Sequence, residues 1–148
     1  MRTRPYAYRH IVATLFGCRA NLLDEKLLLN TTLKAIQNAN MRLAKTRAQN
    51  PVVYKVEDDI MGGGVSVNAL IITSHLTIHT SRLYRTVEFD CATCGVDSNP
   101  WAALDTFKHA LRPTHVATQY EHDDLRERVL ALPSVKPLKS LSAEDLLE

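Results

Sequence analysis

Residues 71–82, IITSHLTIHTSR, place three groups capable of chemistry in a run otherwise suited to a buried strand. They are Ser74, His75 and His79. A polar atom in such a strand needs a hydrogen-bond partner or has a functional role. A serine hydroxyl can act as a nucleophile, and an imidazole titrates near neutral pH and can take its proton. Cys94 lies downstream. Singly each of these residues is most often structural; together they indicate a reactive site.

Cys91 and Cys94 form a C-x-x-C pair, which with His75 and His79 gives the ligand types of a Cys₂His₂ zinc site. In a strand, however, His75 and His79 are roughly 13 Å apart, too far to bind one ion. The sequence contains no second C-x-x-C, and a redox C-x-x-C normally opens a helix after a βαβ unit. We therefore expect no metal.

Length and composition narrow the class of protein. The chain has 148 residues, 45% of them hydrophobic and 23% charged, which predicts one globular domain. A formal net charge of +2 without a dense Lys/Arg block argues against nucleic acid as a partner. No apolar run approaches the ~20 residues of a membrane span, and the first ten residues lack a secretory apolar region. Three cysteines are too few for a disulfide framework, so we expect a cytoplasmic protein.

The first elements follow from periodicity and capping. Residues 9–18 are rich in β-branched and aromatic side chains and predict a strand ending near Gly17. Residues 21–41 predict a helix with Asn21 as its N-cap. The apolar stripe expected on this helix consists of Leu22, Leu29, Leu33 and Ile36.

The remainder reads as strands and one further helix. Three glycines in 61–66 do not form G-x-G-x-x-G, so we interpret them as a tight turn. Pro100, Pro113 and the stripe of Leu104, Phe107 and Leu111 define a helix over 98–113. The expected strands are 51–57, 67–80, 83–91 and 115–122, with 67–80 and 83–91 as an antiparallel pair.

This order, β-α-β-β-β-α-β, predicts an α+β two-layer sandwich: a mainly antiparallel β-sheet with the helices packed on one face. Residues 1–122 form the expected domain. Residues 123–148 are charged and then broken by Pro133 and Pro137, which predicts a short C-terminal helix and a tail.

Three motifs resemble one known family. GGGVS at 62–66, SHLTIHT at 74–80 and TCG at 93–95, followed by a Pro-Trp helix, are similar to the prokaryotic S-adenosylmethionine decarboxylase proenzymes. The opening RHIVATLFGCRANLLDEKLL (9–28) is similar to that family's first strand and helix. The likeness covers roughly residues 9–122. It implies a self-cleaving decarboxylase of polyamine biosynthesis that forms homodimers of processed protomers.

The resemblance also implies roles. Ser74 would attack the carbonyl of Thr73 and, by ester formation and β-elimination, leave a pyruvoyl group as the cofactor, without a metal. The chain would be cut between Thr73 and Ser74. Ser66 would stabilise the processing intermediate, His79 would take the Ser74 Cα proton, and Cys94 would protonate the substrate carbon. Cys91 is expected to be a dispensable core residue.

Three positions depart from the family pattern. Thr73 replaces the usual glutamate before the cleaved serine, Leu83 stands where a ribose-binding acid is expected, and Ile60 replaces an aromatic residue. S-adenosylmethionine is the family's substrate; some relatives instead decarboxylate L-ornithine or L-arginine. The acidic run Glu57, Asp58 and Asp59 would suit the distal cation of such an amino acid, or it is a solvated turn. A third alternative is a non-catalytic regulatory paralogue.

Overall fold

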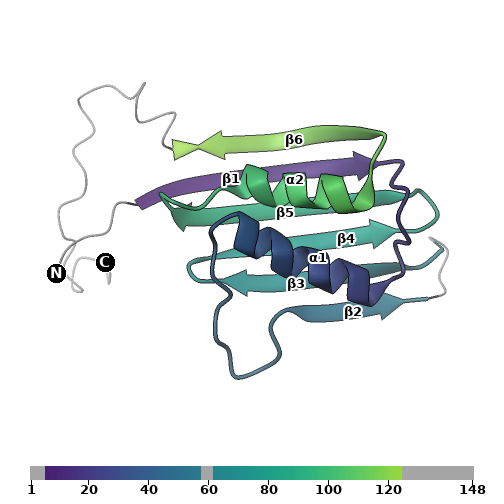
Figure 1. Ribbon diagram of the computed structural model, residues 1–148, viewed down its shortest axis with the longest axis horizontal. Coiled ribbons are helices and arrows are strands. Elements are labelled where there is room, and N and C mark those ends of the chain that lie inside the picture. Colours follow the sequence, from purple (N-terminus) through teal and green to yellow (C-terminus); the bar gives the residue numbers. More distant parts are fainter. Residues whose placement is uncertain (1–5, 58–61, 125–148) are drawn as a thin grey trace, which may run out of the picture.

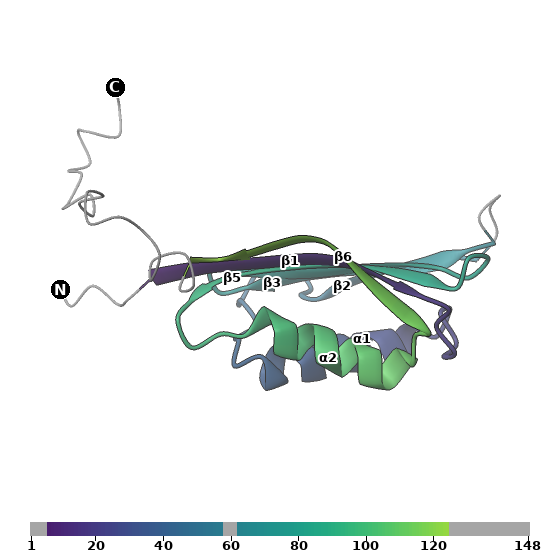
Figure 2. The same cartoon turned by 90° about the horizontal axis from the view of Figure 1, so that it is seen from above.

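In the computed structural model, which describes residues 6–57 and 62–124, one six-stranded sheet has its strands in the order β2-β3-β4-β5-β1-β6. Every neighbouring pair is antiparallel. Both helices lie on one side of the sheet (Figures 1 and 2). The elements are β1 (Tyr6–Phe16), α1 (Glu25–Asn38), β2 (Val52–Val56), β3 (Gly64–Ile71), β4 (Ser74–Ser81), β5 (Thr86–Gly95), α2 (Pro100–Leu111) and β6 (His115–Asp123).

This architecture confirms the predicted α+β two-layer sandwich. The core lies between the sheet and the two helices, where α2 buries Leu104, Phe107 and Leu111 as expected. Phe107 meets Phe89 of β5 edge to face, with ring centroids 5.6 Å apart. The sheet face opposite the helices is called the open face below; alternation along the strands places His75 and His79 on it.

The single strand predicted over 67–80 is wrong, because the chain reverses within it. β3 ends at Ile71, β4 begins at Ser74, and these two residues pair across the hairpin. The turn consists of Ile72 and Thr73, and Thr73 has φ of 67°. Neither residue is a glycine, proline or asparagine, so the sequence carries none of the usual turn signals there. The chain therefore has one strand more than predicted.

The start and the buried face of α1 also differ from the prediction. Asp24, not Asn21, is the N-cap: its side chain accepts from the Leu27 amide at 2.9 Å. Asn21 instead accepts from the Leu23 amide in the preceding turn. Leu33 is exposed. The buried face includes two threonines whose hydroxyls donate to carbonyls one turn earlier, so that they are buried without an unmet polar group: Leu28, Thr31, Thr32, Ala35 and Ile36.

The glycine segment is a turn, as interpreted, but it is shorter than predicted. Gly62 and Gly63 have φ of 73° and 82°, and β3 already begins at Gly64. A Cβ on Gly64 would lie 2.0 Å from the Thr80 carbonyl oxygen of β4. The third glycine therefore lets β3 and β4 approach closely where β3 begins.

Some predictions fall outside the described residues. Asp58, Asp59 and Ile60 are among them, as is nearly all of the predicted C-terminal helix and tail at 123–148. Within the described ranges, neither helix has the length and apolar character needed to cross a membrane.

Candidate active site

Ser74 opens β4 directly after the hairpin turn and lines a cavity of about 730 Å³. The cavity is also lined by Thr73, Thr93 and Cys94, and by the segments 40–42 and 95–98 that lead into and out of the helical layer. Its size falls within the usual range of small-molecule sites. The hairpin and the end of β5 therefore present the predicted nucleophile to a space that a substrate can enter.

Ser74 and Cys94 are in contact. The Ser74 hydroxyl donates to Cys94 Sγ, with Oγ and Sγ 3.9 Å apart. Thr73, whose carbonyl carbon is the expected target of Ser74, has a left-handed φ that a β-branched residue rarely adopts. Such a conformation costs roughly 1–3 kcal/mol and persists where the surrounding fold imposes it. The predicted scissile bond thus begins in a strained turn.

Ser66 and His79 form a second pair. They face each other in the β3–β4 register, and Ser66 Oγ lies 2.7 Å from His79 Nδ1. His79 is five residues along β4 from Ser74, a separation of about 16 Å in an extended strand. One chain therefore brings Ser74 to Cys94, and Ser66 to His79, but it does not bring the two pairs together.

Leu83 lies at the same end of β4 as His79. It is in the β4–β5 turn, 58% exposed, and its Cβ would be 3.0 Å from a Cβ added to Gly62. Leu83 therefore lies beside the glycine turn that precedes β3. Glu57, which precedes Asp58 and Asp59 in the sequence, pairs with Lys55 at 2.9 Å. This ion pair holds the pKa of the Glu57 carboxyl below its ordinary value.

The two cysteines of the C-x-x-C pair have different environments. Cys91 is fully buried in the core, and burial raises the pKa of its thiol to about 12, so it is neither a nucleophile nor a metal ligand at neutral pH. Cys94 is half-buried at the cavity. Because Cys91 belongs to the core, this geometry does not support the zinc alternative.

His75 belongs to a polar cluster that sequence reasoning missed. His75 Nε2 and His10 Nε2 lie 3.0 and 2.7 Å from the same oxygen of Asp90. Tyr8 Oη lies 3.0 Å from His10 Nδ1. Within residues 6–57 and 62–124, this His₂Asp set is also the group whose ligand atoms are close enough to hold a metal ion. The signal was present in the alternation of β1 and β5, but their pairing is not local in sequence.

Asp90 is ionised in this cluster. Its partial burial favours the neutral acid, but hydrogen bonds with His10 and His75 outweigh burial and lower the pKa of the Asp90 carboxyl. Tyr8 responds in the opposite direction: burial first, and then the nearby Tyr120 and Cys94, raise the pKa of its phenol. Tyr8 therefore lies within electrostatic range of Cys94.

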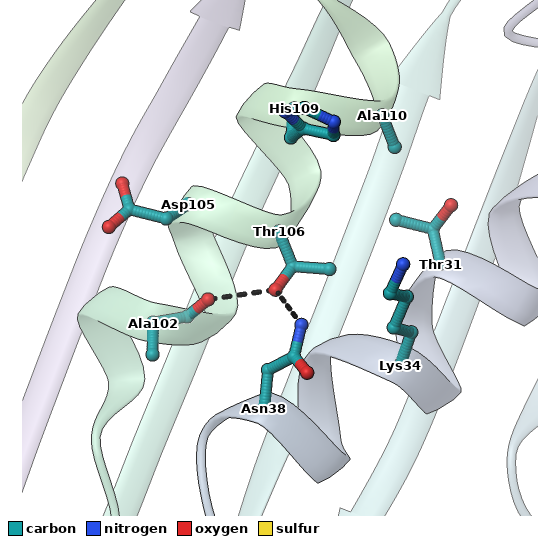
Figure 3. A pocket seen from close by; sticks show the side chains of 8 residues that line it. All are labelled: Thr31, Lys34, Asn38, Ala102, Asp105, Thr106, His109 and Ala110. Carbon is teal, nitrogen blue, oxygen red and sulfur yellow. Dashed lines mark hydrogen bonds between the residues drawn. The ribbon is translucent and has the colours of Figure 1, made fainter.

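A second cavity, of about 390 Å³, lies between the two helices and contains none of the predicted site residues (Figure 3). Thr106 sits at its centre, donating to the Ala102 carbonyl and accepting from Asn38 Nδ2. Lys34 and His109 point toward this groove from α1 and α2. It has no contact with the hairpin that carries Ser74.

The fold and the site together define a class: a two-layer α+β protein with a serine that directly follows a strained hairpin turn and contacts a thiol. The chain belongs to the S-adenosylmethionine decarboxylase family, whose model matches residues 9–122. The predicted resemblance is thereby confirmed.

Relatives carry two different names. An arginine decarboxylase proenzyme of Ignicoccus hospitalis is 35% identical over 123 residues, which is 82% of this chain and 81% of that protein. An S-adenosylmethionine decarboxylase proenzyme of Thermotoga maritima is 31% identical over 132 residues, 89% of this chain and 95% of the other. The crystal structure of the adenosylmethionine decarboxylase from Aquifex aeolicus matches with a TM-score of 0.67 at 21% identity, covering 93% of this chain and 98% of that one. This structural likeness supports the fold.

Proposed function

We propose that this protein is a self-processing, pyruvoyl-dependent decarboxylase of an amino-acid-type substrate. The observation that carries the proposal is Ser74, which follows the left-handed Thr73, touches Cys94 and opens onto a substrate-sized cavity. Cleavage between Thr73 and Ser74 would leave fragments 1–73 and 74–148. The residues present fit a pyruvoyl group at position 74, because the nucleophile, a strained target carbonyl and a thiol meet there.

A pyruvoyl group at position 74 would supply a ketone that accepts the substrate amine and an adjacent carbonyl that accepts electrons during loss of CO₂. The side chains of this protein have the remaining tasks. Cys94, in contact with residue 74, is positioned to hand a proton to the substrate carbon. No metal is needed for these steps.

We propose a homodimer because the Ser74–Cys94 pair and the Ser66–His79 pair are far apart in one chain. His79 is the proposed base for the Ser74 Cα proton, and Ser66 is its hydrogen-bonded partner. The ~16 Å between positions 74 and 79 in one strand is too long for proton transfer. A second copy would supply His79 and Ser66 to the first copy's Ser74. The proposed active unit is therefore a dimer with two composite sites.

S-adenosylmethionine is the first candidate substrate. It is the substrate named for the family whose model matches this chain and for the Thermotoga maritima relative. A cavity of about 730 Å³ has room for a nucleoside. The product would serve polyamine, and specifically spermidine, biosynthesis.

L-Arginine, with L-ornithine, is the second candidate. Leu83 offers no carboxylate to ribose hydroxyls, and leaving such groups unpaired costs about 1–3 kcal/mol each when buried. Four of the relatives, each 31–37% identical to this chain, are named arginine decarboxylase proenzyme. Asp58 and Asp59 are the proposed partners of the distal cation in this alternative.

A ¹⁴CO₂-release assay with S-adenosylmethionine, L-arginine, L-ornithine and L-lysine separates the candidates. If a diamino acid is the substrate, Asp58→Asn and Asp59→Asn should raise its KM at least tenfold by loss of a charge-assisted contact. Glu57→Gln is the matched control, because Glu57 is already paired with Lys55. Turnover of S-adenosylmethionine alone, unchanged by both substitutions, would exclude the diamino acids.

The regulatory alternative makes a different prediction. A non-catalytic paralogue would stay intact during long incubation and carry no carbonyl that reacts with hydrazines. Denaturing electrophoresis distinguishes it from the enzyme, which should run as two fragments.

We infer a cytoplasmic location from the thiols. None of the three cysteines is in a disulfide, and the proposed chemistry requires Cys94 to remain reduced. Fractionation of cells that express the protein, with detection of the 74–148 fragment, tests this location.

A further inference from the structure

Thr93 has a buried hydroxyl that no group within residues 6–57 and 62–124 satisfies. Its side chain is 1% exposed, and its Oγ1 has no hydrogen-bond partner. Other buried threonines are satisfied: Thr32 donates to the Leu28 carbonyl, and Thr80 donates to the Leu22 carbonyl while accepting from the Val65 amide. A buried polar group that lacks a hydrogen-bond partner calls for a specific explanation.

The position of Thr93 suggests one. His75 of β4 faces Ala92 of β5 in the register, so Thr93 is the next position along and stands opposite Ser74. Directly opposed residues have Cβ atoms about 4.5–5.5 Å apart. Both side chains line the same cavity. In this state the Ser74 hydroxyl donates to Cys94, which leaves the lone pairs of Ser74 Oγ available to another donor.

A buried cation continues this row of residues. Arg9 of β1 faces Thr93 in the register and is 9% exposed. Its Nη2 donates to the carbonyls of Gly95 and Val96, while its Nε has no partner. Within the described residues, Arg9 forms no ion pair with an acid. A row across β1, β5 and β4 is therefore formed by Arg9, Thr93 and Ser74. It contains two hydrogen-bond donors without acceptors and one positive charge, but no negatively charged side chain.

We propose that the Thr93 hydroxyl donates a hydrogen bond to Oγ of residue 74 during self-cleavage. This inference rests on the proposed function. After acyl transfer, Ser74 Oγ bridges the Thr73 carbonyl carbon and the Cβ of residue 74. In the elimination, a base removes the Cα proton, the Cα–Cβ double bond forms, and the Cβ–Oγ bond breaks. The electron pair of that bond goes to Oγ, which leaves as one oxygen of the new Thr73 carboxylate.

This role explains why the hydroxyl is unmet beforehand. A donor that gains its acceptor only as charge develops stabilises the transition state more than the ground state. The buried guanidinium of Arg9 adds a favourable potential for the same anion. Thr93 would thus be a catalytic residue of processing, distinct from Cys94, which the proposed function assigns to turnover.

The test compares Thr93→Val, which removes the hydroxyl at nearly constant shape, with Thr93→Ser, which keeps it. Freshly translated chains are sampled over time on denaturing gels, with and without hydroxylamine, which cleaves an ester. We expect Thr93→Val to accumulate the ester and to form fragments about 100-fold more slowly, as when one preorganised donor is lost. Thr93→Ser should cleave within about threefold of wild type, and Thr32→Val, the matched control, at the wild-type rate.

Folding is checked in chains that cannot cleave. In a Ser74→Ala background, Thr93→Val should keep or raise Tm, because it replaces an unmet hydroxyl with a methyl group. If Thr93→Val cleaves at the wild-type rate, the proposed role of Thr93 is overturned, while the proposed function stands. The same conclusion follows if Thr93→Val lowers Tm and Thr93→Ser also fails to cleave. A wild-type chain that stays intact would overturn the proposed function as well.

Discussion

Strand β4 begins at Ser74, whose hydroxyl donates to Cys94 inside a cavity, and five residues later it carries His79, bonded to Ser66 on the neighbouring strand. The first end holds the proposed nucleophile and proton donor. The second end holds the proposed base, with Leu83 just beyond it. Each end contains a hydrogen-bonded pair of side chains, but neither end contains both the nucleophile and the base. In the proposed dimer, the first end of one copy and the second end of the other would together complete the reaction site.

The largest expected effect comes from an experiment that places the two functional ends of β4 on different chains. His79→Ala alone should slow fragment formation at least ~100-fold, because the proton acceptor is lost. Coexpressed with Ser74→Ala, whose His79 is intact, the His79→Ala chains should be cleaved again in the mixed dimers. Gel analysis with distinct tags on the two chains provides the measurement. Mixed dimers in which no His79→Ala chain is cut would place the base within its own chain.

The second prediction separates processing from turnover at the first end. Cys94→Ala should still yield both fragments, while decarboxylation falls about 100-fold and protonation at the wrong site consumes the carbonyl. Fragment formation and ¹⁴CO₂ release, measured on the same sample, report the two steps. Cys91→Ala is the matched control, since Cys91 is a buried core residue with a pKa of about 12. Full turnover by Cys94→Ala would remove Cys94 from the chemistry.

The smallest expected effect concerns the cluster of His10, His75 and Asp90 on the open face. Asp90 has a lowered pKa, so its ionised form contributes stability above the ordinary carboxyl value of 3.8, and this contribution is lost as pH falls through the lowered value. Asp90→Asn should therefore destabilise the fold at pH 7 by less than about 1 kcal/mol, because the carboxylate is partly exposed. Urea titrations at pH 7, 5 and 3 should show this difference shrinking below pH ~3.8. A difference independent of pH would contradict the assignment.

The sequence predicted α2 well because local signals agree there. Asn99 caps the helix, Pro100 begins it, and the stripe ending at Leu111 is buried. The β3–β4 hairpin escaped prediction because Ile72 and Thr73 carry strand-forming side chains rather than turn chemistry. The face of α1 was misplaced because buried Thr31 and Thr32 satisfy their own hydroxyls and do not look apolar in sequence.

The site was predictable in part. Once the turn is placed at 72–73, the antiparallel register requires Ser66 to face His79, as it does. The contact of Ser74 with Cys94 depends on the β4–β5 register and was expected only from the family resemblance. Thr93 and His10 were missed because their significance lies in an unmet hydroxyl and in β1–β5 pairing, and neither is visible in a linear pattern.

The central claim is that Ser74 becomes the reactive carbonyl of this protein, and intact-mass analysis of the purified chain tests it most directly. The account predicts two fragments, 1–73 and 74–148. The second fragment should lack an N-terminal amine and gain one hydrazine adduct, whereas Ser74→Ala should give one intact chain that does not react with hydrazine. A wild-type chain that remains intact after long incubation, with no hydrazine adduct, would contradict the account.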